Sequence, residues 1–339
     1  MKPRHRLIAP LPPGPLDVVG DVHGELGLLE RLLVKLGRDP VTFEATDARA
    51  ANRSLVFVGD LVDRGPDSVE VLRRVMPAVR EGRALCVMGN HELNALRVPD
   101  LVDHSHWFHG GGPGPATMPQ AVLPPDEKAA VLAFFRSLPL ALEREDVVVV
   151  HASWDPASAD RLRDAKDPVD AWHHAHNLTP PGGWEAAVDP DDPAAADAQL
   201  VRRNANPVRR LTAGPEFLSP QPFEIHGRRF RHARTPWWDA WAGPPYVIFG
   251  HYWRRPNETP PEGDPALPFG GHGPRDELGL PGADGRPSAM CIDHCAGASW
   301  QRRPPAVAAG VASIATDLSA FRWPERELVF AGHGPRPLP

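Results

Sequence analysis

Two carboxylates and a guanidinium lie within five residues of one another near the start of the chain. Asp60, Asp63 and Arg64 come directly after residues 55–58, an apolar run that is short, rich in β-branched and aromatic residues and bounded by glycine, as buried strands are. Proteins that alternate strands and helices place their chemistry at the carboxyl ends of strands. Such a cluster can hold a metal ion and a phosphate group, whereas on this segment alone a solvated charged turn is an equal alternative.

The same arrangement recurs at other predicted strands, and each brings residues that can bind metals. These are Asp21 and His23 after residues 16–19, Asn90 after 84–88, His151 after 147–150, and His251 after 246–249. Carboxylate, imidazole and amide oxygen suit Mn²⁺, Fe or Zn²⁺. With Asp60 the set is too large for one tetrahedral ion, and it suits two ions about 3.5–4 Å apart that share a carboxylate and clamp a phosphoryl group.

The segments between these runs must bring the candidate ligands together. Residues 25–36 carry leucines at the spacing of an amphipathic helix, and Gly37 follows as its stop. A second helix begins at Pro66 and ends before Gly82. Strands and helices therefore alternate in a β-α-β-α-β order, which predicts a sheet whose active edge lies at the strand carboxyl ends.

Later elements are less regular. We predict a helix over residues 126–138 and final strands near 289–292 and 327–330. One domain over residues 1–339 is expected, with irregular insertions near three segments that are rich in proline, glycine or histidine. These segments are residues 103–125, which we interpret as a surface loop, 155–215 and 254–287.

The composition is that of a globular protein without a basic surface. Of 339 residues, 42% are hydrophobic, which is enough for a sizeable core. A net charge of −6 argues against nucleic acid or an acidic membrane as an obligatory partner. Cys86, Cys291 and Cys295 give no disulfide framework, which favours a reducing compartment, and with no signal peptide or transmembrane run we expect a cytoplasmic protein. The oligomeric state has no signal in the sequence.

Three motifs resemble the signature blocks of the phosphoprotein-phosphatase branch of the calcineurin-like metallophosphoesterases, bacterial type. They are GDVHG at residues 20–24, GDLVDRG at 59–65 and GNHE at 89–92, in family order and at familiar spacing. The resemblance covers the first half of the chain and reaches the second half only through His151 and His251. It implies an α/β sandwich of two mixed β-sheets flanked by α-helices, and a kinship with serine/threonine protein phosphatases and diadenosine tetraphosphatases.

The resemblance also implies a role for each matched residue. Asp21 and His23 would hold one divalent ion, Asp60 would bridge to a second, and Asn90, His151 and His251 would hold that one. Manganese is the expected metal, with iron, zinc or nickel as alternatives. His91, oriented by Asp63, would protonate the leaving group, while Arg64 and Asn90 would contact the phosphate. The reaction would be a direct attack of metal-bound hydroxide on phosphorus.

Two further assignments follow from the resemblance. The segment 202–207 is similar to an arginine-containing block of bacterial members, so Arg203 or Arg202 is the candidate for a second phosphate contact, with a solvated basic turn as the alternative. Asp293 would be an acid behind the ligands, although His294 and Cys295 replace the threonine and glycine of many relatives.

The sequence thus predicts a metal-dependent phosphatase that acts on phosphomonoesters, with phosphoserine or phosphothreonine in proteins as the leading substrate. The alternative is a hydrolase of dinucleoside polyphosphates such as diadenosine tetraphosphate. A third hypothesis, a non-catalytic phosphate-binding module, is disfavoured because every expected ligand is present.

Two groups of aromatic and imidazole side chains are open to both a functional and a structural interpretation. The histidines within residues 103–109 and 172–176 could bind a further metal, but solvated loop positions are favoured. The tryptophans at 237, 238, 241 and 253 could stack on a nucleobase, but packing beside the strand at 246–249 is favoured.

Overall fold

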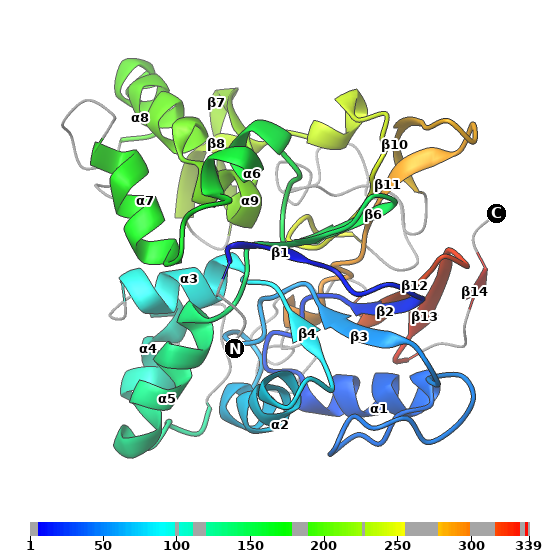
Figure 1. Ribbon diagram of the computed structural model, residues 1–339. Coiled ribbons are helices and arrows are strands. Elements are labelled where there is room, and N and C mark those ends of the chain that lie inside the picture. Colours follow the sequence, from blue (N-terminus) through cyan, green and yellow to red (C-terminus); the bar gives the residue numbers. More distant parts are fainter. Residues whose placement is uncertain are drawn as a thin grey trace.

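A computed structural model places two six-stranded sheets face to face, with helices on their outer surfaces (Figure 1). The structure describes residues 6–98, 102–110, 120–177, 189–225, 228–254, 277–298, 316–332 and 336–337. One sheet has the order β1-β5-β6-β9-β11-β10 and the other β14-β13-β12-β2-β3-β4.

The strands of the first sheet are β1 (Ile8–Pro10), β5 (Ala141–Glu143), β6 (Val147–Val150), β9 (Tyr246–Phe249), β10 (Leu278–Pro281) and β11 (Pro287–Cys291). Those of the second sheet are β2 (Leu16–Val19), β3 (Ser54–Phe57), β4 (Leu85–Cys86), β12 (Ser319–Trp323), β13 (Glu327–Phe330) and β14 (Arg336–Pro337). Both sheets mix parallel and antiparallel pairs, which confirms the predicted sandwich.

Alternation along the strands divides the apolar residues between two cores. Val18 and Val56 belong to the layer between the sheets, together with Val149 of the facing sheet. Their neighbours Val19 and Phe57 point the other way and pack with the leucines of α1 (Leu26–Leu36). In Figure 1, α1 and α2 (Ser68–Arg80) lie beneath the sheet that contains β2 and β3. β2 and β3 are therefore buried on both faces, as their largely apolar sequences predict.

The predicted β-α-β-α-β unit is confirmed. β2, β3 and β4 are parallel neighbours, and α1 and α2 connect them. Gly37 ends α1 in the left-handed conformation at φ 82°, where glycine avoids the cost of a side chain. The strand ends of this unit consequently meet at one edge.

The surface-loop interpretation of residues 103–125 is wrong for residues 103–109, whereas residues 120–124 have no regular secondary structure. α4 (Val102–His109) is a helix, and Pro125 begins α5 (Pro125–Arg136). Trp107 and Phe108 of α4 are buried, at 0% and 4% exposure. Burial of these apolar side chains stabilises a helix here. The glycine, proline and histidine residues of the segment show no helical periodicity, so the sequence did not indicate it. Parts of all three predicted insertions lie outside the described residues, namely 111–119, 178–188 and 255–276.

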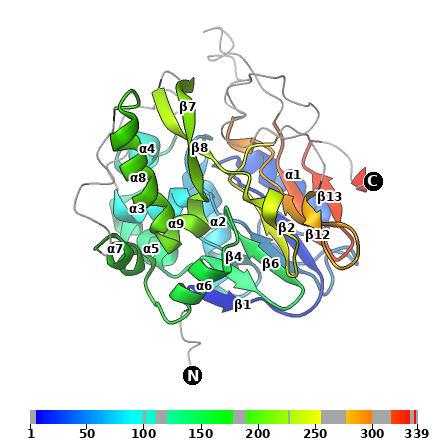
Figure 2. The same ribbon diagram turned by 90° about the horizontal axis from the view of Figure 1, so that it is seen from above.

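The described parts of the segment 155–215, residues 155–177 and 189–215, were expected to be irregular but are mainly helical. They contain α6 (Pro156–Leu162), α7 (Pro168–Asn177), α8 (Pro193–Ala205) and α9 (Pro207–Ala213), and each helix begins at a proline. The prolines that obscured the pattern are helix starts, since the first turn has no hydrogen bond for proline to remove. A hairpin of β7 (Glu216–Ile225) and β8 (Arg228–Arg234) follows, and Figure 2 shows α8 running alongside it.

The remaining sequence expectations concern cysteines and membranes. Cys86, Cys291 and Cys295 are all buried and unbonded to one another, as predicted. Among the helices in the described part of the chain, none has the length and apolar character needed to cross a bilayer.

Candidate metal centre

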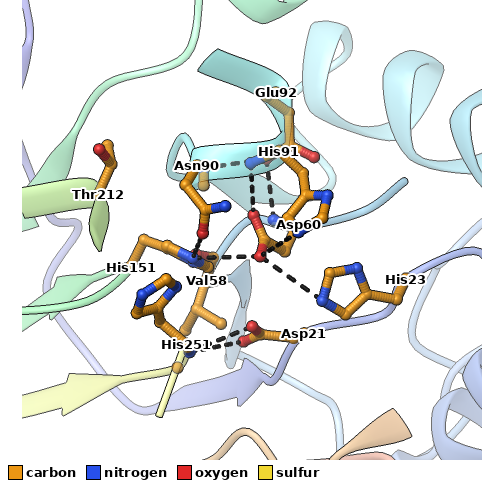
Figure 3. Close-up of polar contacts among 12 residues, drawn as sticks. Asp21, His23, Val58, Asp60, Asn90, His91, Glu92, His151, Thr212 and His251 are labelled. Carbon is orange, nitrogen blue, oxygen red and sulfur yellow. Dashed lines mark hydrogen bonds and ion pairs between the residues drawn. The ribbon is translucent and has the colours of Figure 1, made fainter. Parts of the chain in front are cut away.

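Both sheets deliver polar side chains to one place because their parallel strands end at the same edge. β2, β3 and β4 run parallel in one sheet, and β6, β9 and β11 run parallel in the other. The loops that follow five of these strands carry the predicted ligands, and Figure 3 shows their side chains gathered around Asp60. α3 (Asn90–Arg97) begins in the loop after β4 and contributes its first two residues.

Asp60 is the centre of this cluster. Its Oδ2 atom lies 3.6 Å from Nε2 of His23, 3.3 Å from Nε2 of His151 and 3.8 Å from Nε2 of His91. Candidate ligand atoms fall into two groups that share Asp60, one with His23 and His91 and one with His151 and His251. A carboxylate common to two groups is the arrangement that a pair of bridged ions requires.

The inward-facing imidazole nitrogens are set by bonds on the opposite side of each ring. Nδ1 of His23 donates to the carbonyl oxygen of Val62 at 2.9 Å, and Nδ1 of His151 donates to that of Val58 at 2.7 Å. These bonds leave both Nε2 atoms directed at Asp60. Histidine ligands of protein metal sites are commonly oriented in this way.

The other two predicted ligands lie at the same site. Oδ1 of Asn90 lies 3.2 Å from Nε2 of His151, on the side where Asp60 also approaches. The carboxylate of Asp21 accepts the backbone N–H of His251 at 3.1 Å. Gly250 precedes this contact, and a Cβ atom there would lie 2.0 Å from Oδ1 of Asp21. The glycine therefore allows the loop after β9 to approach the acid from the loop after β2.

Burial and neighbouring charges shift the pKa values of the acids and of His151 at the site. Asp21 and Asp60 are buried, at 1% and 2% exposure. Burial, with Asp293 next, raises the pKa of Asp21 well above its ordinary value. Burial also tends to raise the pKa of Asp60, but the charges of His151 and His91 outweigh this effect and hold that pKa well below the usual range. Burial alone would lower the pKa of His151, but Asp60 raises it to about 9.

This donor set fits divalent metal ions. Burial lowers the pKa values of His23 and His251 well below the ordinary imidazole range, so both rings are neutral near pH 7 and can offer a lone pair. Lone pairs of neutral imidazoles facing a buried carboxylate repel one another unless a cation lies between them. Hard oxygen and imidazole nitrogen donors suit Mn²⁺, Fe²⁺ or Zn²⁺ and do not select among them.

Strained backbone accompanies these contacts. His23, Asp60 and His251 have φ values of 46°, 49° and 65°, in the left-handed region that costs a non-glycine residue about 1–2 kcal/mol each. Asp63 and Arg64 share this conformation at 71° and 66°. Strain of this kind is concentrated at functional sites in proteins.

Glu92 organises the loop from which Asp60 projects, although the sequence analysis gave it no role. Its carboxylate accepts backbone N–H groups from Asp60 at 2.9 Å, Leu61 at 2.7 Å and Gly89 at 2.9 Å. Burial, with Asp60 next, raises its pKa to about 7. A glutamate three residues after the start of a helix is a known N-terminal signal, so the GNHE motif itself could have indicated this role.

His91 contacts both the cluster and an acid behind it. Its Nδ1 donates to Oδ2 of Asp63 at 2.5 Å, as the resemblance implied. Its Nε2 lies 3.4 Å from a guanidinium nitrogen of Arg64. His91 also forms a candidate ligand group with His23 and Asp60. The contacts of His91 alone therefore suit either a metal ligand or a proton donor.

A cavity of about 250 Å³ opens beside Asn90 and His251. Four arginines line it, Arg97 of α3, Arg203 of α8, Arg209 of α9 and Arg234 of β8. Glu216 is the one acid among its lining residues, and it accepts hydrogen bonds from Arg203 at 3.0 Å and Arg209 at 2.8 Å. We call this cavity the arginine pocket.

The arginine pocket distinguishes between Arg202 and Arg203, the two candidates that the sequence offered for a second phosphate contact. Arg203 lines it, whereas Arg202 does not. Arg97, Arg209 and Arg234 also line the pocket, but they come from segments with no shared motif, so no sequence pattern indicated them. Arg234 donates to the carbonyl oxygen of His251 and is held against the loop after β9 by this contact.

Asp293 lies in the loop after β11, buried at 1% exposure. Its Oδ1 accepts the backbone N–H of Cys295 at 2.9 Å. Burial raises its pKa, and the positive charge of Arg64 opposes that shift. Its charge acts on the pKa of Asp21, and the charge of Arg64 acts on its own, so it lies within electrostatic reach of both residues.

The tryptophans near β9 mainly serve packing. Trp238, at 1% exposure, packs against Phe249 and Tyr252 with ring centroids 5.4 and 4.8 Å apart. Trp253 differs, because the guanidinium of Arg64 lies 5.3 Å from its ring centroid. His173 and His174 are exposed on α7, a helix and not the loop that the sequence suggested.

A two-sheet sandwich with a carboxylate shared between two imidazole groups suits a metal-dependent phosphoesterase. Comparison with known families agrees, since the model of the calcineurin-like phosphoesterases matches residues 14–208. The chain belongs to this family. It is accordingly a hydrolase that acts on phosphate esters and uses divalent metal ions.

Named relatives share a narrower description. The chain is 28% identical over 254 residues to the symmetrical bis(5'-nucleosyl)-tetraphosphatase of Ralstonia nicotianae, covering 72% of this chain and 80% of the relative. It is 47% identical over 76 residues to the asymmetrical bis(5'-nucleosyl)-tetraphosphatase PrpE of Oceanobacillus iheyensis. That match spans 22% of this chain and less than a third of the relative, at 30%.

Among solved structures, a protein serine/threonine phosphatase from Saccharomyces cerevisiae is similar at 18% identity and a TM-score of 0.39. The similarity covers 73% of this chain and 65% of the yeast chain.

Proposed function

We propose that the protein is a metal-dependent hydrolase of dinucleoside polyphosphates. This substrate class was the alternative in the sequence analysis, behind phosphorylated proteins. The relatives whose names describe bis(5'-nucleosyl)-tetraphosphate hydrolysis favour it. The observation that carries the proposal is the arginine pocket beside the metal centre.

The charge of the arginine pocket suits a chain of phosphates better than a single phosphomonoester. Four guanidinium groups face one carboxylate, and burial together with Arg209 lowers the pKa of Arg203 to about 10, so it stays charged near pH 7. Crowded cations are stabilised by a polyanion. A monoester has one phosphate, which two bound metal ions and Arg64 would neutralise, whereas a tetraphosphate has further phosphates that need partners.

The size of the arginine pocket is consistent with this role. Small-molecule sites that enclose a whole ligand are about 300–1,000 Å³, and this cavity, at about 250 Å³, is smaller. It can take phosphate groups and leave the nucleosides outside. Arg97, whose guanidinium lies 3.7 Å over the ring of Trp172, forms one wall.

Within this proposal, each residue has a separate task. Asp21, His23, Asp60, Asn90, His151 and His251 would hold two ions, which supply positive charge for the phosphate and activate water when bound. Arg64 would hold phosphate oxygens, and its planar fork fits two of them at once. His91, with Asp63 behind it, would give a proton to the leaving oxygen. We expect manganese as the ion.

The test compares diadenosine tetraphosphate, a phosphoserine peptide and p-nitrophenyl phosphate with and without Mn²⁺. We expect the highest kcat/KM on diadenosine tetraphosphate, and only with metal. Arg203→Gln should lower that value by about tenfold, the scale of one charge-assisted hydrogen bond, and leave p-nitrophenyl phosphate within about twofold.

The matched control is Arg202→Gln, one position away on α8 and outside the arginine pocket. This variant should leave kcat/KM unchanged on both diadenosine tetraphosphate and p-nitrophenyl phosphate. A preference for the phosphopeptide, or equal losses in the two variants, would overturn the assignment of dinucleoside polyphosphates.

A further inference from the structure

We propose that Trp107 is a positioning residue for proton transfer by His91. This inference rests on the proposed function, because it takes His91 as the proton donor. It adds a residue from α4, a helix that belongs to no motif of the sequence.

A continuous chain of hydrogen bonds joins the three side chains. The indole N–H of Trp107 donates to Oδ1 of Asp63 at 2.5 Å, and Oδ2 of Asp63 accepts from Nδ1 of His91 at 2.5 Å. All three side chains are buried, at 0%, 0% and 5% exposure. Each oxygen of the Asp63 carboxylate therefore has a different partner.

The indole is suited to this place because it can only donate a hydrogen bond. It requires an acceptor at Oδ1 and so favours the ionised carboxylate of Asp63. The backbone N–H of Asp63 also donates to Oγ of Ser68 at 2.9 Å. Main chain and side chain are thus held separately, which limits rotation of the carboxylate about its χ angles.

The orientation of Asp63 determines that of His91. With Nδ1 occupied, Nε2 of His91 faces the cluster, 3.8 Å from Oδ2 of Asp60. In the reaction, water adds to phosphorus and the bond from phosphorus to the leaving oxygen breaks. The electron pair of that bond goes to the leaving oxygen, which takes the proton from Nε2. One proton of the water stays on the phosphate product, and the other returns to His91 through solvent.

Trp107→Phe tests the proposal because it keeps an aromatic ring and removes the N–H. Phenyl phosphate needs a proton on its leaving oxygen, whereas p-nitrophenolate leaves readily without one. With Mn²⁺ saturating, we expect kcat to fall about tenfold on phenyl phosphate and by less than about twofold on p-nitrophenyl phosphate, with KM and bound manganese unchanged. Equal losses on both substrates would mean a merely structural role.

Two comparisons separate positioning from packing. Phe108→Leu perturbs the next buried position of α4 without a bond to Asp63, and it should not change the ratio of the two rates. In a His91→Asn background, Trp107→Phe should have no further effect on phenyl phosphate. Independent, additive losses would overturn the proposal.

The outcome can be told apart from failure of the proposed function. If the wild-type protein lacks metal-dependent turnover on every substrate, the proposed function is wrong and not only the role of Trp107. If Trp107→Phe does not fold, benzothienylalanine at position 107 keeps the indole shape with sulfur in place of N–H. A selective loss of kcat on phenyl phosphate relative to p-nitrophenyl phosphate in that variant would then support the positioning role, and equal losses would overturn it.

Discussion

Residues of the metal centre and residues of the arginine pocket reach neighbouring positions by different routes. Candidate ligands such as Asp60 and His151 lie on short loops directly after buried strands, where backbone contacts hold them. The pocket arginines extend from α3, α8, α9 and β8, and Glu216 pairs two of them. Short side chains on strained loops suit metals, which require fixed ligand distances. Long side chains held by ion pairs suit a flexible polyanion.

The largest expected effect in this comparison is at the shared carboxylate. Asp60→Asn should lose bound manganese and lower kcat by about three orders of magnitude, since it removes the charge that both ligand groups share. Metal analysis and turnover of p-nitrophenyl phosphate provide the measurement.

A chelator supplies the control for that variant. Metal bound only by the folded state raises the melting temperature of the wild-type protein, so chelation should lower it. The melting temperature of Asp60→Asn should not respond. Two bound ions and normal rates in the variant would show that Asp60 is not shared between them.

The glycines of the metal-ligating loops test how rigid that edge is. Gly59 has a φ of 93°, and a Cβ atom there would lie 2.4 Å from the backbone nitrogen of Gly89. Gly59→Ala should therefore destabilise the protein by about 3–4 kcal/mol, from overpacking and left-handed strain together, and weaken metal binding.

Gly82→Ala is the matched control for Gly59→Ala. Gly82 also has a positive φ, 76°, but nothing lies within 4 Å of the added Cβ atom. It should cost only about 1 kcal/mol and leave metal binding unchanged. Denaturant unfolding with and without Mn²⁺ measures both, and equal effects would argue against close backbone contact as the cause.

The smallest effect is expected at the support of the arginine pocket. Glu216→Gln leaves Arg203 and Arg209 beside each other without a counterion and should lower the free energy of unfolding by about 2 kcal/mol. Metal content should not change, because within the described part of the chain the Glu216 carboxylate contacts Arg203 and Arg209 and no candidate ligand.

Glu70→Gln is the control for an exposed ion pair. Glu70 pairs with Arg73 at 2.6 Å on the surface of α2, with both side chains 45% exposed. The change should stay within about 0.5 kcal/mol. A loss of manganese in Glu216→Gln would contradict the separation of metal centre and arginine pocket.

Much of the metal-ligating edge could be predicted from the sequence because its signals are local. Apolar runs such as residues 147–150 are buried strands, and the residue after each run is placed by the strand itself. The four helices between Pro156 and Ala213 could not be recognised, because prolines at their first positions resemble loop signals. Glu92 was within reach of sequence reasoning, since its spacing from Gly89 is a helix-start signal.

The residue types of the candidate ligands, the strands that present them and the family resemblance can all be inferred from the amino-acid sequence. Only the folded chain shows that Trp107 meets Asp63, that Arg203 and not Arg202 faces the arginine pocket, and that Arg234 lies beside His251. Those contacts join residues far apart in the chain through side chains whose direction depends on how helices and hairpin pack. No local pattern encodes that packing, whereas a ligand at a strand end is positioned by its own strand.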